Sequence, residues 1–459
     1  MNENLMSNNN GDVKISLKEK IAYSFGDTAC NIVYGLTSIL TFFYTDYVGV
    51  PIGIVGLIIL ISRVFDGGSD LIMGLLTDRT KSKYGKARPW ILWMCVPYAI
   101  SGVLLFTIPP NATVMVKAVY IFVTYNLMQT ICYTAINLPY SSLAALMTRD
   151  QQERGTINAL RMGISPFGRM LTTSATLPLV KLMGNTQQAW IIASVFYGVL
   201  ALVLLLICFF ATKERVQFET QAKEKIPVLT SLKALLKNKY WAMSLLLWAF
   251  LMVYLTLSGT TLTYYSKYVL GNDLLYSPIY FAEQIALILV IFLIPFFLKK
   301  TTKRTLTMIG AAICILSRVV LIFDPTSFNM VMLSAVLSGI GQAPLMGVIF
   351  SFIADAVEYG QWKTHLRLEG LIYSAASVGN KLGTGITAAI ISSILDKAGY
   401  DGTLAVQNIT AVNAIHDIYV LGPLPVWGII ILLLVFWQLD KTYPSMMKEL
   451  SEREAKGEL

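Results

Sequence analysis

The sequence has little charge and almost no histidine. Charged residues occupy 14% of the 459 positions and histidine only two, whereas soluble proteins carry about 25% charged residues. Hydrophobic residues reach 55%, and the mean hydropathy is +0.61. This balance is wrong for a soluble protein and indicates a multi-pass membrane protein.

The cysteines are too few and too scattered for a disulfide framework or a zinc site. Cys30, Cys95, Cys132, Cys208 and Cys314 all fall within long apolar stretches and lack metal-ligand spacing. We interpret them as small apolar packing residues. A metalloenzyme therefore has little support, and no cofactor is expected.

Apolar stretches long enough to cross a bilayer recur along the chain. A membrane-spanning helix needs about 20 predominantly apolar residues. Stretches of this kind lie at 20–46, 51–77, 90–109, 114–146, 157–182, 187–211, 238–266, 276–298, 305–323, 328–354, 370–395 and 418–438. We predict an all-α membrane protein with twelve transmembrane helices and with both termini on one side.

Lysine and arginine gather in alternate loops. They collect at 78–88, 213–239 and 299–304, whereas loops such as "MGNTQQ" and "DPTSFN" contain none. The positive-inside rule then places the basic loops and both termini in the cytoplasm of a cell-membrane protein. The net charge of +9 reflects this topology, so no nucleic-acid partner is needed.

The longest polar interruption divides the helices into six and six. We expect a cytoplasmic tail over 1–16, a first six-helix bundle over 17–212, a central cytoplasmic loop over 213–237, a second bundle over 238–440 and a cytoplasmic tail over 441–459. Two bundles joined in this way are typical of transporters whose site lies near mid-membrane.

The segment "RVFDGGSD" puts charge inside the second apolar stretch. Asp66 and Asp70 are one helical turn apart on one face, and Arg63 lies on the same side. A charge at the bilayer centre costs roughly 2.5–3.5 kcal/mol, and Arg63 offsets only one of the two acids. An internal ion pair is the structural alternative. We predict a cation-coupling site, for sodium or for a proton.

Further polar residues follow helical spacing in three other stretches. They are Asp27, Asn31, Tyr34, Ser38 and Thr41; Asn126, Thr130, Tyr133, Asn137 and Ser141; and Ser374, Ser377, Lys381 and Thr384. Helix packing explains any single one of them equally well. Three stripes together favour a water-filled cavity.

Two basic residues also lie inside predicted helices. Lys381 is mid-helix, which favours a functional role, whereas Arg161 lies about one turn inside its helix and could reach the cytoplasm instead. Glu283 is the remaining buried acid and a candidate partner of either one.

Several segments carry a family resemblance. They are "YSFGDTACN", "FFYTDYVG", "RVFDGGSDLIMGLLTDRTKSKYGKARPWIL", "INLPYSSLAALMTRDQQERG" and "IADAVEYGQWKTHLRLEG". In this order they resemble the glycoside-pentoside-hexuronide cation symporters, the melibiose-permease family of the major facilitator superfamily. The resemblance implies the major facilitator fold and cation-coupled sugar uptake by alternating access.

The resemblance and the polar stripes together give the expected site residues. The cation-binding set is Asp66, Asp70, Thr134 and Asn137, and the substrate-binding set is Asp27, Asn31, Tyr133, Asn137, Arg161, Ser377 and Lys381. Charges expected to gate or to structure the molecule are Arg63, Asp78, Arg79, Asp150, Glu153, Arg154, Asp355 and Glu358. The basic loop 78–88 and the turn after Asp355 form either cytoplasmic latches or ordinary solvated loops.

The substrate is left open between two sugar classes. Asn31 and Asn137 stand where the family's melibiose permease has sugar-binding aspartates, so melibiose itself is doubtful. Two lost negative charges beside Arg161 and Lys381 favour an anionic sugar such as a hexuronide. Neutral xylosides are nearly as well supported.

We therefore expect a sodium-coupled or proton-coupled sugar symporter that functions as a monomer in the lipid bilayer. A membrane enzyme would need a nucleophile, a metal set or an interfacial acid–base pair, and none is evident in the sequence. A sugar sensor that does not transport could use the same pocket.

Overall fold

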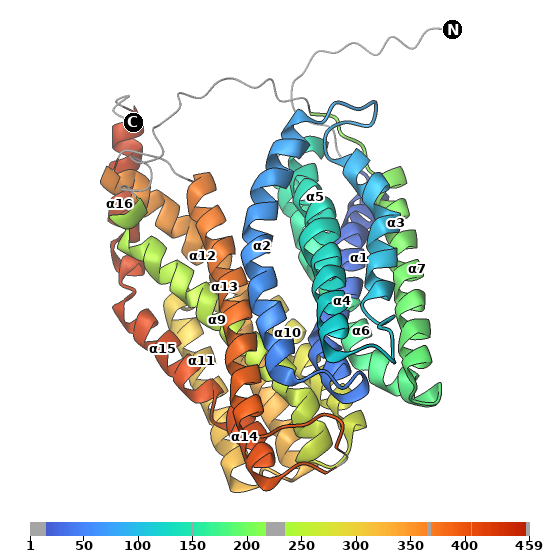
Figure 1. Ribbon diagram of the computed structural model, residues 1–459. Helices are drawn as coiled ribbons and strands as arrows, with labels where there is room; N and C mark the ends of the chain where they lie inside the picture. The colour runs from blue at the N-terminus through green and yellow to red at the C-terminus, as the bar shows by residue number, and fades with distance from the viewer. Residues whose placement is uncertain (1–14, 149–150, 217–234, 365–368, 405, 456–459) are drawn as a thin grey trace. The chain divides into compact units, whose positions relative to one another are not determined.

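The computed structural model describes residues 15–148, 151–216, 235–364, 369–404 and 406–455. Its regular structure is helical throughout these ranges. Contacts divide the chain into two units (Figure 1). Unit 1 comprises 1–40 and 65–221, and unit 2 comprises 41–64 and 222–459. Two of the helices, α1 and α2, therefore contribute residues to both units.

Unit 1 contains most of the first six predicted spans. Its elements are α1 (Leu17–Phe42), the second half of α2 (Ile52–Arg79), α3 (Arg88–Leu104), α4 (Val114–Asn126), the π-helix η2 (Leu127–Tyr133), α5 (Thr134–Met147), α6 (Gln151–Leu182) and α7 (Gln187–Ala211). Helices α3 and α7 pack side by side (Figure 1). In its interior the rings of Tyr23 and Tyr140 stack with centroids 4.6 Å apart.

Unit 2 contains the other spans and the hairpin between α1 and α2. Its elements are the π-helix η1 (Phe43–Tyr47), the first half of α2, α9 (Lys239–Tyr268), the 3₁₀ turn η3 (Asp273–Leu275), α10 (Tyr276–Leu298), α11 (Lys303–Phe323), α12 (Phe328–Thr364), α13 (Glu369–Lys397), α14 (Ile409–Val420), α15 (Pro423–Phe436) and α16 (Leu439–Ala455). Helix α12 packs against both α10 and α11, and α13 packs against α9.

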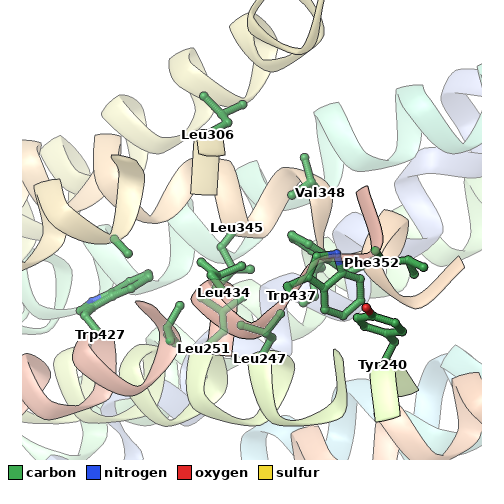
Figure 2. Close-up of a cluster of buried hydrophobic side chains, with 14 of the residues drawn as sticks. Tyr240, Leu247, Leu251, Leu306, Leu345, Val348, Phe352, Trp427, Leu434 and Trp437 are labelled. Carbon is green, nitrogen blue, oxygen red and sulfur yellow. The ribbon is translucent and has the colours of Figure 1, made fainter. Parts of the chain in front are cut away.

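A cluster of aromatic and aliphatic side chains forms the core of unit 2 (Figure 2). Trp427 and Trp437 are fully buried there. The Trp437 ring lies 5.1 Å from the ring of Tyr240 and 4.8 Å from that of Phe352, measured between centroids. Buried aromatic pairs of this kind add about 0.5–1.5 kcal/mol each beyond their burial, which fixes α9, α12 and α15 against one another.

Side chains at the helix starts satisfy exposed backbone donors. Thr186, Asn238, Thr302 and Asn408 each accept a hydrogen bond from the amide three residues later, at the starts of α7, α9, α11 and α14. Such caps contribute about 1 kcal/mol each and set where the helices begin. The sequence boundaries of 187, 238, 305 and 276 agree with these helices to within a few residues.

All twelve predicted spans fall on helices. Eight helical stretches among the described residues are long and apolar enough to cross a membrane. The other four predicted spans correspond to α1, α3, α6 and α13. All five cysteines are buried and free, which confirms their interpretation as packing residues.

Three predicted helix ends were wrong. Helix α12 continues to Thr364 rather than to 354, and the span predicted at 418–438 is two helices that begin at Ile409 and break at Gly422 before Pro423. The tail predicted from 441 is largely the helix α16. Hydropathy detects only the apolar part of a helix, whereas α12 and α16 have polar surfaces that contact each other.

Candidate functional site

The two acids of α2 lie in unit 1 beside a helix-five threonine. Asp66 is 1% exposed and Asp70 is half-buried. Thr134 Oγ1 lies 3.5 Å from Asp70 Oδ1. Arg63, one turn earlier on α2, belongs to unit 2, where its side-chain stem packs against Gly385 of α13. The arrangement gathers two carboxylates and a hydroxyl, which are oxygen donors of the type that a hard cation takes.

A π-helical segment leads into this group. The chain predicted as one continuous helix over 114–146 winds as a π-helix from Leu127 to Tyr133, immediately before Thr134. A π-turn shifts the direction of every later side chain, and such turns are frequent at functional sites. The half-buried Tyr133 and Asn137 obtain their orientation from this shift.

A ladder of polar contacts joins α1 to α6 in unit 1. Arg161 Nε donates to Asp27 Oδ2 at 2.9 Å. One turn along, Asn31 Nδ2 donates to Ser165 Oγ at 3.2 Å. The predicted polar stripe of α1 thus lies along α6, where helix α6 presents Arg161 and Ser165 at a spacing of four residues.

Two glycines allow this close approach. A Cβ atom on Gly168 would lie 2.5 Å from the carbonyl oxygen of Thr28, and one on Gly35 would lie 3.2 Å from the carbonyl oxygen of Arg169. Small residues of this kind let membrane helices pack with their backbones in contact. The polar side chains on either side then reach across the interface.

Aromatic rings complete the same face. The Arg161 guanidinium lies 4.9 Å from the centroid of Tyr140. The Tyr34 and Tyr133 ring centroids are 5.5 Å apart at an angle of 37°. Because Asp27 and Tyr140 both contact Arg161, the positive charge of this arginine is offset inside unit 1. It does not act as an uncompensated cation.

Unit 2 contains a second buried charged group. Gln342 of α12 donates to Glu283 of α10 at 2.7 Å. Arg318 of α11 is 1% exposed and interacts electrostatically with Glu283, and its Nη2 donates to Ser258 at 3.2 Å. Glu283 therefore has Gln342 and Arg318 as neighbours, which corrects the expectation that it pairs with Lys381 or Arg161.

Sequence reasoning missed three intramembrane residues. Arg169 and Arg318 lie mid-helix in "FGRML" and "LSRVV", and Asp46 lies in the quoted segment "FFYTDYVG". A charged residue at such a depth is itself a signal of function, so the two arginines could have been identified. The role of Asp46 depends on contacts with residues far away in the sequence.

Asp46 is the most densely contacted carboxylate of unit 2. Its side chain is fully buried and lies 2.5 Å from Lys267 Nζ. Tyr268 and Tyr400 each donate a hydroxyl to it at 2.6 Å, and so does Thr45. These bonds attach η1 to the end of α9 and to the residue that follows the α13 turn.

The charges expected at the helix ends contact partners within their own units. Glu153 pairs with Lys20 at 2.8 Å in unit 1, and in unit 2 Asp355 pairs with Lys303 while Glu358 accepts a hydrogen bond from Tyr443. Nearby, hydrogen bonds to Glu19 raise the pKa of the Arg215 guanidinium, which therefore stays charged.

Some expected site residues are placed without a described contact, and some lie outside the described residues. Arg79 is exposed, and Arg154 and Lys381 are half-buried. Asp150 and the side chains of Asp78 and Ser377 lie outside the described part of the chain. The roles proposed for these six residues stay predictions.

Comparison with known proteins identifies the kind of molecule. Residues 22–441 match the family model described as MFS/sugar transport protein, where MFS stands for the major facilitator superfamily. The chain belongs to this family. Its members and the relatives below are membrane transporters rather than enzymes, and the twelve helical spans agree with the major facilitator fold.

Two relatives and one solved structure show how far the likeness to this transporter family extends. The isoprimeverose transporter of Lactiplantibacillus pentosus is 33% identical over 95% of this chain and 92% of its own. A putative glycoside/cation symporter of Escherichia coli (strain K12) is 31% identical over 97% of both chains. The crystal structure of the nucleoside transporter NupG matches with a TM-score of 0.62 over 90% of this chain and 99% of its own, at 17% identity, which establishes the fold alone.

Proposed function

We propose that the protein imports an uncharged glycoside together with one sodium ion. The observation that carries this proposal is the group of Asp66, Asp70 and Thr134 within a chain of the sugar-transport family. Buried carboxylates inside a transporter are expensive unless a cation compensates them. A cation with oxygen ligands is the partner that such a group would take.

The choice of an uncharged sugar follows from the contacts of Arg161. The case for a hexuronide counted Arg161 and Lys381 as two uncompensated positive charges. Asp27 offsets the first of them at 2.9 Å, so half of that argument is lost. A site with less net positive charge gains less from an anionic sugar. The name of the isoprimeverose transporter, 33% identical, supports a glycoside of that kind.

The proposed mechanism couples the two substrates through charge. Sodium would neutralise the acids of α2, and the sugar would bind beside Tyr133, Asn137 and Lys381. The loaded site would then open to the cytoplasm as the two units change their relative position, in the alternating-access manner of secondary transporters. A proton could replace sodium at the same carboxylates.

Uptake into proteoliposomes tests the proposal. The purified protein should accumulate isoprimeverose, a neutral disaccharide, when sodium is imposed outside, and should accumulate a glucuronide poorly. Asp66→Asn and Asp70→Asn should each abolish accumulation, by at least about 100-fold if the carboxylate binds the cation. Asp417→Asn is the matched control, since that carboxylate is 62% exposed.

Other outcomes would replace parts of the proposal. Uptake driven by external acid but not by sodium would identify the cation as a proton. Glucuronide uptake above that of isoprimeverose would restore the anionic substrate. Sugar binding without any uptake would favour a sensor, and accumulation that survives both α2 substitutions would refute the cation site.

A further inference from the structure

Arg169 lies deep inside unit 1 on the same face of α6 as Arg161. It is near the middle of the Gln151–Leu182 helix, several turns from either end. An arginine side chain at this depth cannot extend to the aqueous phase, so retaining it requires compensation inside the protein. Residues 161, 165 and 169 follow a spacing of four, which makes Arg169 the third member of the ladder facing α1.

The contacts of Arg169 link it to a pair of aromatic rings. Its Nη2 donates to Ser38 Oγ at 3.3 Å, and its guanidinium lies 5.5 Å from the centroid of Tyr34. The Tyr34 ring lies in turn 5.5 Å from that of Tyr133. Arg169, Tyr34 and Tyr133 therefore form one continuous series across α6, α1 and η2.

The rings are suitable for receiving a sugar. Tyr34 and Tyr133 are both half-buried, on helices whose other side chains are mostly buried. Ligand sites in proteins combine aromatic walls with a few well-placed polar groups, and the half-buried amides Asn31 and Asn137 lie on the same two segments. A cation over one face of an aromatic ring holds that ring in place.

We propose that Arg169 is a positioning residue of the sugar site. It holds the Tyr34 ring next to Tyr133, so that the two rings form the surface on which an uncharged sugar ring stacks. The inference rests on the proposed function, because it names the part of unit 1 that contacts the sugar. It assigns no role to Arg169 in cation binding.

Calorimetric binding of isoprimeverose and, separately, of sodium to the purified protein tests this role. Arg169→Gln should weaken isoprimeverose binding about tenfold and leave sodium affinity unchanged, which separates positioning from a general loss of structure. Arg169→Lys keeps a cation near the ring and should restore most of the affinity. Tyr34→Leu should match Arg169→Gln, and the double variant should be no weaker than the worse single variant.

Arg318→Gln is the matched control, since Arg318 is a buried arginine lying 4.7 Å from the centroid of Tyr419 in unit 2. It should lower stability while the folded protein keeps its isoprimeverose affinity. The inference is overturned if Arg169→Gln keeps its sugar affinity within about twofold, if sodium and sugar affinity fall together, or if the two single losses add.

Misfolding and failure of the proposed function are distinguishable from these results. Should Arg169→Gln not fold, the same inference requires weak sugar binding by Tyr34→Leu together with near-normal binding by Arg169→Lys, and the reverse pattern refutes it. Should the unsubstituted protein bind no isoprimeverose in sodium, the proposed function fails before any variant is compared.

Discussion

Individual charged residues inside the helices are compensated in different ways. Arg161 has an ion pair with Asp27 and a ring contact with Tyr140. Arg318 lies among hydroxyls and over an aromatic ring, with Glu283 as its counter-charge. In each case the compensation comes from a different helix, so every buried charge also fixes a helix–helix contact.

At this scale the Asp27–Arg161 pair makes a prediction about stability. Asp27→Asn leaves the Arg161 charge without its carboxylate, and we expect a loss of about 3 kcal/mol, at the lower end for buried pairs because both side chains keep some exposure. The double variant Asp27→Asn with Arg161→Gln should be more stable than Asp27→Asn alone, since no lone charge remains. Thermal unfolding in detergent measures both.

Equal stability of Asp27→Asn and the parent would show that Arg161 finds full compensation elsewhere. In that case the argument for an uncharged sugar would also weaken, because it depends on Asp27 neutralising this arginine.

Among the elements, the π-helix η1 depends on a single carboxylate. Asp46 receives four donors, and one of them is the ammonium of Lys267. A Cβ atom on Gly402 would lie 2.5 Å from the carbonyl oxygen of Thr45, so the loop after α13 contacts the η1 backbone directly. The attachment of 41–64 to unit 2 is therefore both polar and closely packed.

We predict that Asp46→Asn loosens this attachment locally. Hydrogen bonds to a charged group contribute about 1.5–3 kcal/mol, so amide exchange in 43–47 should accelerate at least about tenfold, measured by hydrogen–deuterium exchange. Tyr400→Phe removes one donor only and should have a smaller effect. Asp401→Asn, next to Tyr400 in the sequence, is the control and should leave exchange in η1 unchanged; unaltered exchange in Asp46→Asn would contradict the prediction.

For the whole molecule, the charge that moves in one transport cycle distinguishes the candidate substrates. One sodium with an uncharged sugar carries one positive charge, and a membrane potential adds about 2.3 kcal/mol per charge per 100 mV. An inside-negative potential of 100 mV should therefore raise isoprimeverose accumulation by about 50-fold at equal sodium on both sides. A potassium gradient with valinomycin supplies that potential in proteoliposomes.

A glucuronide carried with one sodium would show no such dependence, because its negative charge cancels that of the ion. Isoprimeverose uptake that is insensitive to potential would mean that no net charge crosses with the sugar, which would contradict one-to-one symport with sodium.

The sequence by itself determined the membrane class, the twelve spans and the depth of Asp66 and Asp70. A bilayer sets the length of an apolar helix and penalises every charge inside it, so both features are visible in a linear chain. It also located Thr134, which the structure places 3.5 Å from Asp70. The ends of α12 and the helix α16 were not visible, because their polar surfaces resemble loops.

Only the tertiary structure decided which residues compensate the buried charges. Asp27 and Arg161 are 134 positions apart, and Asp46 and Tyr400 are 354 apart. Such pairs form where two helices approach closely enough, at Gly35 and Gly168 or at Gly402, and where a π-turn redirects the side chains. Helical periodicity shows which residues share a face, whereas the neighbour of that face is set by packing.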